Sequence, residues 1–190
     1  MLLDFFEQEG VDVVKNVLDI YLKEKGLSRE ALLKNEAFSE HKLTKVSQSD
    51  PESYSEETLN SLSEELNVAS DALLTDLKRI RDSDALFEVT TADELKQKVK
   101  EQEDEFLVKG DFRELMKEIK RSQVSETAEL GFELGSGGSG TILAQGVLRV
   151  LNLFEDDRKL ENLKQNIGHL YSIDFINEDE AKLRLKQLDY

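Results

Sequence analysis

The stretch GLSREALLKNEAFSEHKLTKVSQ, from Gly26 to Gln48, decides the fold of the first half of the chain. Glycine is common just after the last residue of a helix, so Gly26 ends the helix that is predicted before it. Ser28 and Ser39 are typical N-cap residues, and each is predicted to begin a helix. Only about three helical turns separate the two serines. The stretch therefore predicts two short helices that follow one another closely.

Helices are predicted on both sides of this stretch. From Val11 to Lys25, apolar residues recur at the spacing of one helix face. These apolar residues are Val14, Val17, Leu18, Tyr21 and Leu22. Downstream, the only proline, Pro51, lies in a polar loop, and Ser55 and Ser70 begin two further predicted helices. Residues 1–83 are thus predicted to form a domain of five short helices.

The pattern from Tyr21 to Leu74 resembles the five-helix DNA-binding domain of phage-repressor or XRE-type helix-turn-helix regulators. The resemblance covers about 55 of the 190 residues. It rests on the Gly26-Leu27-Ser28 start, on Leu32, Phe38-Ser39, Leu43 and Val46, and on the closing pattern from Thr58 to Leu74. A bundle of five short helices would bury a set of aliphatic side chains at these positions. They are Leu32, Leu43, Val46, Leu59, Leu62, Leu66, Leu73 and Leu74.

The resemblance also implies which residues contact DNA, because the second helix of such a motif enters the major groove. Its exposed residues would be Ser39, His41, Lys42, Thr44, Lys45 and Gln48, with Glu40 beside them. Lys42 and Lys45 would contact phosphate or guanine, Gln48 adenine, and Thr44 a base edge or a thymine methyl group. In the turn before this helix, Ala37 replaces the usual glycine, and Leu33 and Glu36 also depart from the family pattern. We therefore expect a remodelled turn.

The charge of the chain keeps a second hypothesis open. The formal net charge is −16, and residues 1–80 contain 9 basic and 17 acidic residues, a net charge of −8. A DNA-binding domain usually presents a positive face, so any DNA contact must be local. The leading hypothesis is a transcriptional regulator that binds double-stranded DNA. The alternative is an acidic interaction module, antitoxin-like or anti-repressor, whose degenerate helix-turn-helix binds a basic protein.

Residues 90–190 are predicted to form a second, α+β domain, with the junction near Ser83–Val89. Two capping boxes, Thr91 with Glu94 and Asp111 with Glu114, begin helices, and the first helix is predicted to continue to Gly110. Near the C-terminus, apolar and polar residues alternate on both sides of a turn with the sequence NEDE, which predicts a β-hairpin. Its apolar residues are Tyr171, Ile173, Phe175, Ala181, Leu183 and Leu185. The predicted fold class is mainly α, a helix-turn-helix bundle followed by this α+β domain.

A polar segment that is expected to be flexible follows residue 121 and ends in a glycine-serine run, Gly135–Gly140, which precedes a strongly apolar segment. A phosphate-binding P-loop needs a lysine after its last glycine, and this run has none, so no nucleotide cofactor is expected. Its composition is that of a flexible linker, either natural or engineered. Apolar residues surround most of the predicted helix over 141–155, which indicates burial in the core or in a homodimer contact.

Several classes of site are excluded by composition. The chain has no cysteine and two histidines, which excludes thiolate chemistry and histidine-rich metal centres. It contains no calcium-loop motif and no recognisable catalytic constellation, so we expect no bound metal and no enzymatic activity. There is no long apolar run and no basic region at the N-terminus, so we expect a cytoplasmic protein that does not enter the membrane.

Overall fold

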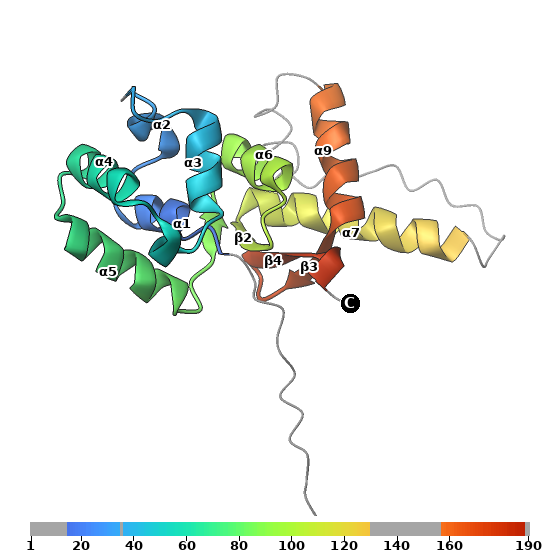
Figure 1. Cartoon of the computed structure of the whole chain (residues 1–190). Helices are drawn as coiled ribbons and strands as arrows, with labels where there is room; N and C mark the ends of the chain where they lie inside the picture. The colour runs from blue at the N-terminus through green and yellow to red at the C-terminus, as the bar shows by residue number, and fades with distance from the viewer. Residues whose placement is uncertain (1–14, 35, 130–156, 189–190) are drawn as a thin grey trace, which may run out of the picture.

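The computed structural model describes residues 15–34, 36–129 and 157–188. Within them the chain is mainly helical, with a small four-stranded sheet built from residue 87 onward (Figure 1). The N-terminal elements are α1 (Val17–Glu24), α2 (Arg29–Leu32), α3 (Glu40–Ser47), the 3-10 turn η1 (Pro51–Ser53), α4 (Glu56–Leu66) and α5 (Ser70–Arg81). They are followed by β1 (Phe87–Val89), α6 (Ala92–Glu101), β2 (Glu105–Lys109), α7 (Asp111–Glu129), α9 (Asp157–Leu170), β3 (Tyr171–Phe175), β4 (Glu180–Leu185) and the 3-10 turn η2 (Lys186–Leu188). No helix in the described ranges has the length and apolar character needed to cross a membrane.

Local signals set the ends of the first helices. Gly26 follows α1 with a φ of 70°, and the Leu27 amide donates to the Leu22 carbonyl at 2.8 Å, which closes the helix. The Ser39 hydroxyl accepts a hydrogen bond from the backbone N–H of Lys42 at 3.2 Å and so caps α3. Both predicted helix ends are confirmed.

The start of α5 differs from the prediction. Its N-cap is Ala69, and Ser70 is the first residue of the helix, so the expected cap at Ser70 is wrong. The Ser70 hydroxyl instead accepts from Ser63 at 3.0 Å and donates to Asn60 at 3.1 Å, both in α4. A contact between helices has replaced the local cap.

The turn between α2 and α3 avoids a strained backbone at Ala37. In the described residues, a positive φ occurs at Gly26, Asn67, Gln102 and Gly110, and Ala37 is not among them. Phe38 is 5% exposed and anchors the end of the turn in the core. The turn thus accommodates alanine without the left-handed conformation that favours glycine.

The core of the N-terminal helices contains most of the expected aliphatic residues. Leu32, Leu43, Leu62 and Leu73 are fully buried. Val46 and Leu66 are partly buried and pack against this core, and Leu59 and Leu74 are half-buried. Besides Phe38, the remaining apolar core residues come from the first and last of these helices: Val17, Leu18, Ile20, Tyr21, Leu22, Leu77 and Ile80.

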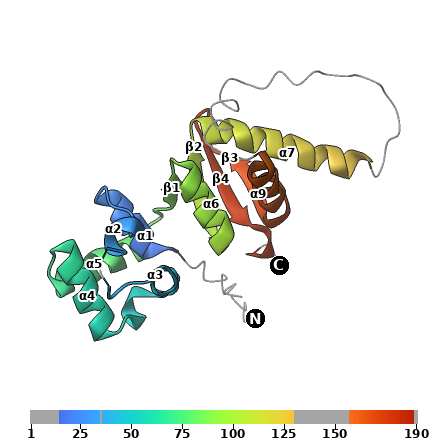
Figure 2. The same cartoon turned by 90° about the horizontal axis from the view of Figure 1, so that it is seen from above.

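The sheet has the strand order β1-β2-β4-β3. β1 and β2 are parallel and are connected through α6, whereas β4 runs antiparallel to both β2 and β3. The β3–β4 pair is the predicted terminal hairpin, in which Ile173 lies opposite Leu183. Phe106 of β2 lies opposite Leu183 on the other side, and its ring makes an edge contact with Tyr171 at 5.4 Å. This buried face packs against α7 and α9, with α6 beside them (Figure 2).

The opposite face of the sheet is polar. Lys109 forms ion pairs with Glu88 and with Glu180, both at 2.8 Å, and Arg184 lies 3.5 Å from Glu105. Such alternation of buried and polar side chains is typical of a sheet that is covered on one side.

Two predictions about the second half are wrong. The helix expected from Thr91 to Gly110 ends at Glu101, because Gln102 adopts a left-handed conformation and the short segment that follows forms β2. The segment after residue 121, expected to be polar and flexible, continues α7 to Glu129. The predictions for Gly135–Gly140 and for 141–155 fall outside the described residues.

Candidate functional site

The α3 helix carries the residues that were expected to contact DNA. Leu43 and Ser47 are buried and hold α3 in the N-terminal core. His41 and Lys45 are exposed on its outer side. Lys42 is half-buried, donates to the Ala37 carbonyl at 3.1 Å, and lies 5.4 Å from the centre of the Phe38 ring. Its ammonium group therefore stays close to the turn that precedes α3.

Two of the expected DNA contacts point toward α6 instead. The Thr44 hydroxyl donates to the Glu101 carboxylate at 3.1 Å. The Gln48 side-chain amide donates to the Glu101 carbonyl at 3.2 Å. The structure thus divides the six predicted residues into two groups. Ser39, His41, Lys42 and Lys45 lie at the start of α3 or on its outer side, and Thr44 and Gln48 contact the last residue of α6.

Glu101 is held in turn by Arg29 from α2. The guanidinium group donates to both Glu101 oxygens, at 2.5 and 3.0 Å, and to both Asp19 oxygens, at 2.7 Å each. Arg29 is only 7% exposed. Burial on its own would lower the pKa of Arg29, but the hydrogen bonds and charges of Asp19 and Glu101 outweigh it and raise the pKa. Arg29 therefore links α1 to α6 as a permanent cation.

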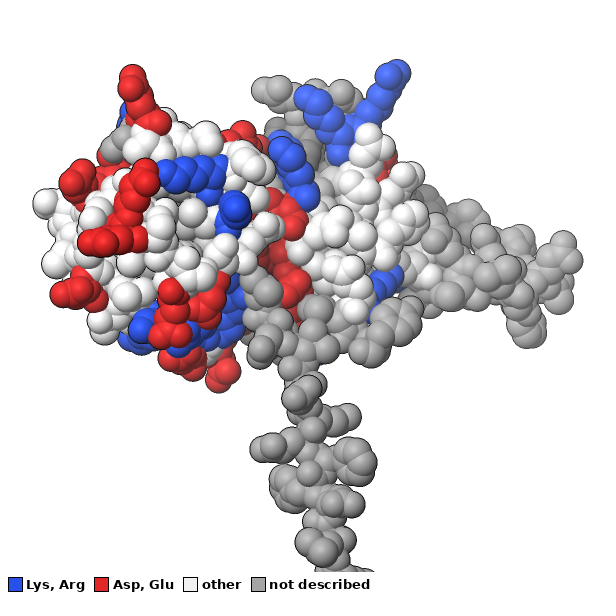
Figure 3. Space-filling view, viewed as in Figure 1, with Lys and Arg blue, Asp and Glu red and all other residues white. Residues whose placement is uncertain are grey.

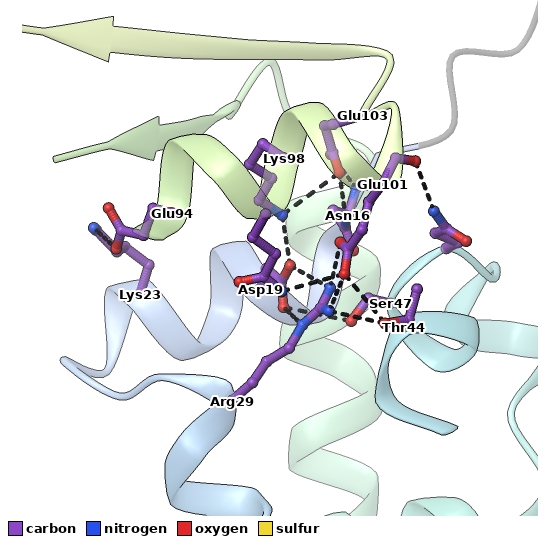
Figure 4. Close-up of polar contacts among 12 residues, drawn as sticks. Asn16, Asp19, Lys23, Arg29, Thr44, Ser47, Glu94, Lys98, Glu101 and Glu103 are labelled. Carbon is purple, nitrogen blue, oxygen red and sulfur yellow. Dashed lines mark hydrogen bonds and ion pairs between the residues drawn. The ribbon is translucent and has the colours of Figure 1, made fainter. Parts of the chain in front are cut away.

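Asp19 is the centre of the cluster (Figure 4). Besides Arg29, it contacts the ammonium of Lys98 in α6 at 2.5 Å and the hydroxyl of Ser47 at 3.4 Å. Burial would raise the pKa of Asp19, but the positive charges of Lys98 and Arg29 and the hydrogen bonds they donate hold it below its usual value. Lys98 is 1% exposed and also lies 4.2 Å from the centre of the Phe87 ring.

Glu103 closes the other end of the cluster. It lies 3.5 Å from Lys98 and accepts hydrogen bonds from the backbone and the side-chain amide of Asn16. Burial raises the pKa of Glu103, and the charge of Lys98 and the bonds from Asn16 offset this only in part. Within the described residues, the Oδ1 atom of Asn16 is buried with no hydrogen-bond partner.

The cluster, defined here as Asn16, Asp19, Arg29, Lys98, Glu101 and Glu103, joins α1 and α2 to α6. Its two cations neutralise two of the three carboxylates, which leaves no site for a metal ion, and none of the described residues form a metal-binding group. A cavity of about 220 Å³ lies beside it and is lined by Asn16, Gln48, Gln102, Glu103 and Asp104. A more exposed contact between Lys23 and Glu94 also joins α1 to α6. The cluster thus fixes the position of α6 relative to α3.

Sequence reasoning missed this cluster, although two signals were present. Asp19 lies between Leu18 and Ile20 in the apolar helix α1. Lys98 lies beside Val99 and one helical turn after Leu95, on the face that α6 buries. A charged residue at a buried helix position requires a partner of opposite charge. These two positions indicated that buried ion pairs would form, but they did not indicate which residues would contact one another.

Comparisons with protein-family models, with curated proteins and with solved structures find no match to this chain.

Proposed function

We propose that the protein is a transcriptional regulator that binds double-stranded DNA through α3. One observation carries the proposal. α3 is capped by Ser39 and anchored by Leu43, and it presents His41 and Lys45 on its outer side, with Lys42 beside the turn that precedes it. This is the arrangement that a groove-reading helix needs, with an apolar inner side and hydrogen-bonding residues outside.

The chemistry of these side chains fits the edges of bases and the phosphate backbone. Lys42 and Lys45 donate hydrogen bonds to guanine or to phosphate oxygens, and Ser39 to phosphate. His41 lies on the same exposed stretch and donates or accepts according to its tautomer. These contacts come from the start and the outer side of α3, whereas Thr44 and Gln48 contact Glu101.

The electrostatics predict weak nonspecific binding. Acidic and basic side chains are interspersed over the N-terminal helices on the face seen in Figure 3, and the chain has a net charge of −16. With only two lysines near phosphates, the logarithm of the binding constant should fall with the logarithm of salt concentration with a slope of about −2 per protomer. The affinity must therefore come from specific base contacts.

The proposal is tested by selecting duplexes that the full chain retains from a random pool and measuring their binding by fluorescence anisotropy over a salt series. Lys42→Glu/Lys45→Glu should lower the affinity by about 100-fold or more, because a favourable charge is replaced by a repulsive one at two contacts. The control is Lys78→Glu/Arg79→Glu, an equal charge change on α5, which should retain nearly all of the affinity. Equal losses in both double variants would contradict a role for α3.

A second function is favoured by two observations: α6 engages Thr44 and Gln48, and acidic residues are in excess. It is an acidic module that binds a basic protein. If selection enriches no duplex at low salt while the protein is folded, this alternative replaces the DNA-binding proposal.

A further inference from the structure

We propose that α6 is a built-in lock on α3, and that DNA binding requires the end of α6 at Glu101 to move away from Thr44 and Gln48. This inference rests on the proposed function. Its basis is that the cluster occupies one side of the helix that would enter the groove, and that each of its two cations keeps a carboxylate partner when the two sides separate.

The space beside α3 is already occupied. The major groove of B-DNA is about 12 Å wide, and an α-helix with its side chains is about 10–12 Å across. The groove therefore admits one helix. The end of α6 lies beside α3, within hydrogen-bond distance of Thr44 (Figure 4) and of Gln48. While it stays there, α3 cannot enter the groove to its full depth.

The same contacts also occupy the hydrogen-bond donors that would bind to bases. Thr44 donates its hydroxyl to the carboxylate of Glu101, and Gln48 donates its amide to the carbonyl of Glu101. A polar group that is already bonded to the protein has to give up that bond before it binds a base. Glu101 and DNA thus compete for the same two side chains.

Separation of α6 from α3 leaves each buried cation with a partner. If α6 moves away, Arg29 keeps both bonds to Asp19, because these two residues lie on α2 and α1. Lys98 keeps Glu103, which follows it in the same part of the chain. Each side retains one pair of opposite charges, and Glu101 passes into water. A buried ion that loses its only partner is costly, but here neither cation does.

Glu101 stabilises only the closed arrangement, in which the end of α6 contacts α3, and not the open arrangement, in which it has moved away. Within the described residues, and apart from Gln97 in its own helix, its side-chain partners are Arg29 and Thr44 from the N-terminal helices. Removal of its carboxylate therefore destabilises the closed arrangement and leaves the open one nearly unchanged. A binder whose competent state is rarely populated gains affinity when the competing state is destabilised.

The lock is tested with two variants of the full chain that act in opposite directions. Glu101→Ala should bind the selected duplex at least about tenfold more tightly than the wild type, since charge-assisted hydrogen bonds that stabilise only the closed state are removed. Its control is Asp93→Ala, which removes an exposed carboxylate at the other end of α6 and should leave the affinity unchanged.

The second variant closes the lock covalently. Asn16 and Gln102 line the same cavity, neither is proposed to contact DNA, and the chain has no cysteine, so Asn16→Cys/Gln102→Cys can be joined by a short bifunctional maleimide. The cross-linked protein should lose DNA binding. The same variant capped with N-ethylmaleimide should retain it, and this comparison removes any effect of the two substitutions themselves.

The outcomes separate the two proposals. Tighter binding by Glu101→Ala together with loss of binding on cross-linking supports the lock. Equal binding by the wild type, Glu101→Ala and both maleimide-treated forms overturns the lock and leaves the DNA-binding function intact. If no form binds any duplex, the cross-linked and opened proteins included, the proposed function is overturned and the lock with it.

Discussion

Replacement of Asp19 by asparagine is the most informative change to the stability of the protein. Asp19 is 5% exposed and accepts hydrogen bonds from Arg29, Lys98 and Ser47. Asparagine has nearly the same shape, but it carries no charge and its NH₂ group cannot accept from either cation. The change therefore leaves two buried cations with one fewer carboxylate.

The loss in the free energy of unfolding caused by Asp19→Asn depends on which partners Arg29 and Lys98 retain. Removal of one partner from a buried ion pair costs about 3–5 kcal/mol. Arg29 retains Glu101 and Lys98 retains Glu103 at the longer distance of 3.5 Å, so we expect a loss near the lower end, about 3 kcal/mol. For a chain of this size that loss lowers the Tm by roughly 6–12 °C.

The assay is urea denaturation followed by circular dichroism, with Asp76→Asn as the matched control. Asp76 is 40% exposed and lies 3.9 Å from Lys25 and from Arg79 on the surface, so its replacement should change the free energy of unfolding by less than about 0.5 kcal/mol. A loss below about 1 kcal/mol for Asp19→Asn would refute the description of the cluster as a buried, ionised network.

Three further changes test other parts of the structure. Burial raises the pKa of Glu103, so the folded protein keeps a proton that the unfolded chain releases above pH 4.5, and stability falls as the pH rises from there through the folded-state pKa. The free energy of unfolding of Glu103→Gln, measured by urea denaturation, should therefore rise relative to that of the wild type as the pH increases over this window. A difference between the two proteins that does not change with pH would contradict the raised pKa. Ser39→Ala removes the cap of α3 and should cost about 1 kcal/mol in the same melts, whereas no loss would show that the cap bond is not formed. Leu43→Ala empties a fully buried position and should cost about 2–5 kcal/mol, while a loss below about 1 kcal/mol would place Leu43 outside the core.

The elements that could be predicted are those with local signals. Ser39 and Thr91 cap their helices through groups three residues away, so a short sequence window contains both partners. The β3–β4 hairpin likewise depends on alternation on both sides of one turn. β1 and β2 were missed because they are short, with three and five residues, and pair with each other across a helix. Neither strand carries enough periodicity to stand out from its neighbours.

The candidate site was predictable only in part. The position of Leu43 and the exposure of Lys45 follow from helical periodicity within α3. The contacts of Thr44 and Gln48 with Glu101 join residues more than 50 positions apart and depend on how α6 packs against the N-terminal helices. No pattern within a helix determines which distant helix will lie beside it. That is why the lock emerges only from the three-dimensional arrangement.

The central claim, that α3 binds DNA, is tested most directly by amide hydrogen exchange of the full chain with and without the selected duplex. We predict that the duplex slows exchange at residues 39–45 and in the turn before them, while α5 and the sheet are unaffected. Slowed exchange confined to other elements, or no change at α3 at saturating duplex, would contradict it.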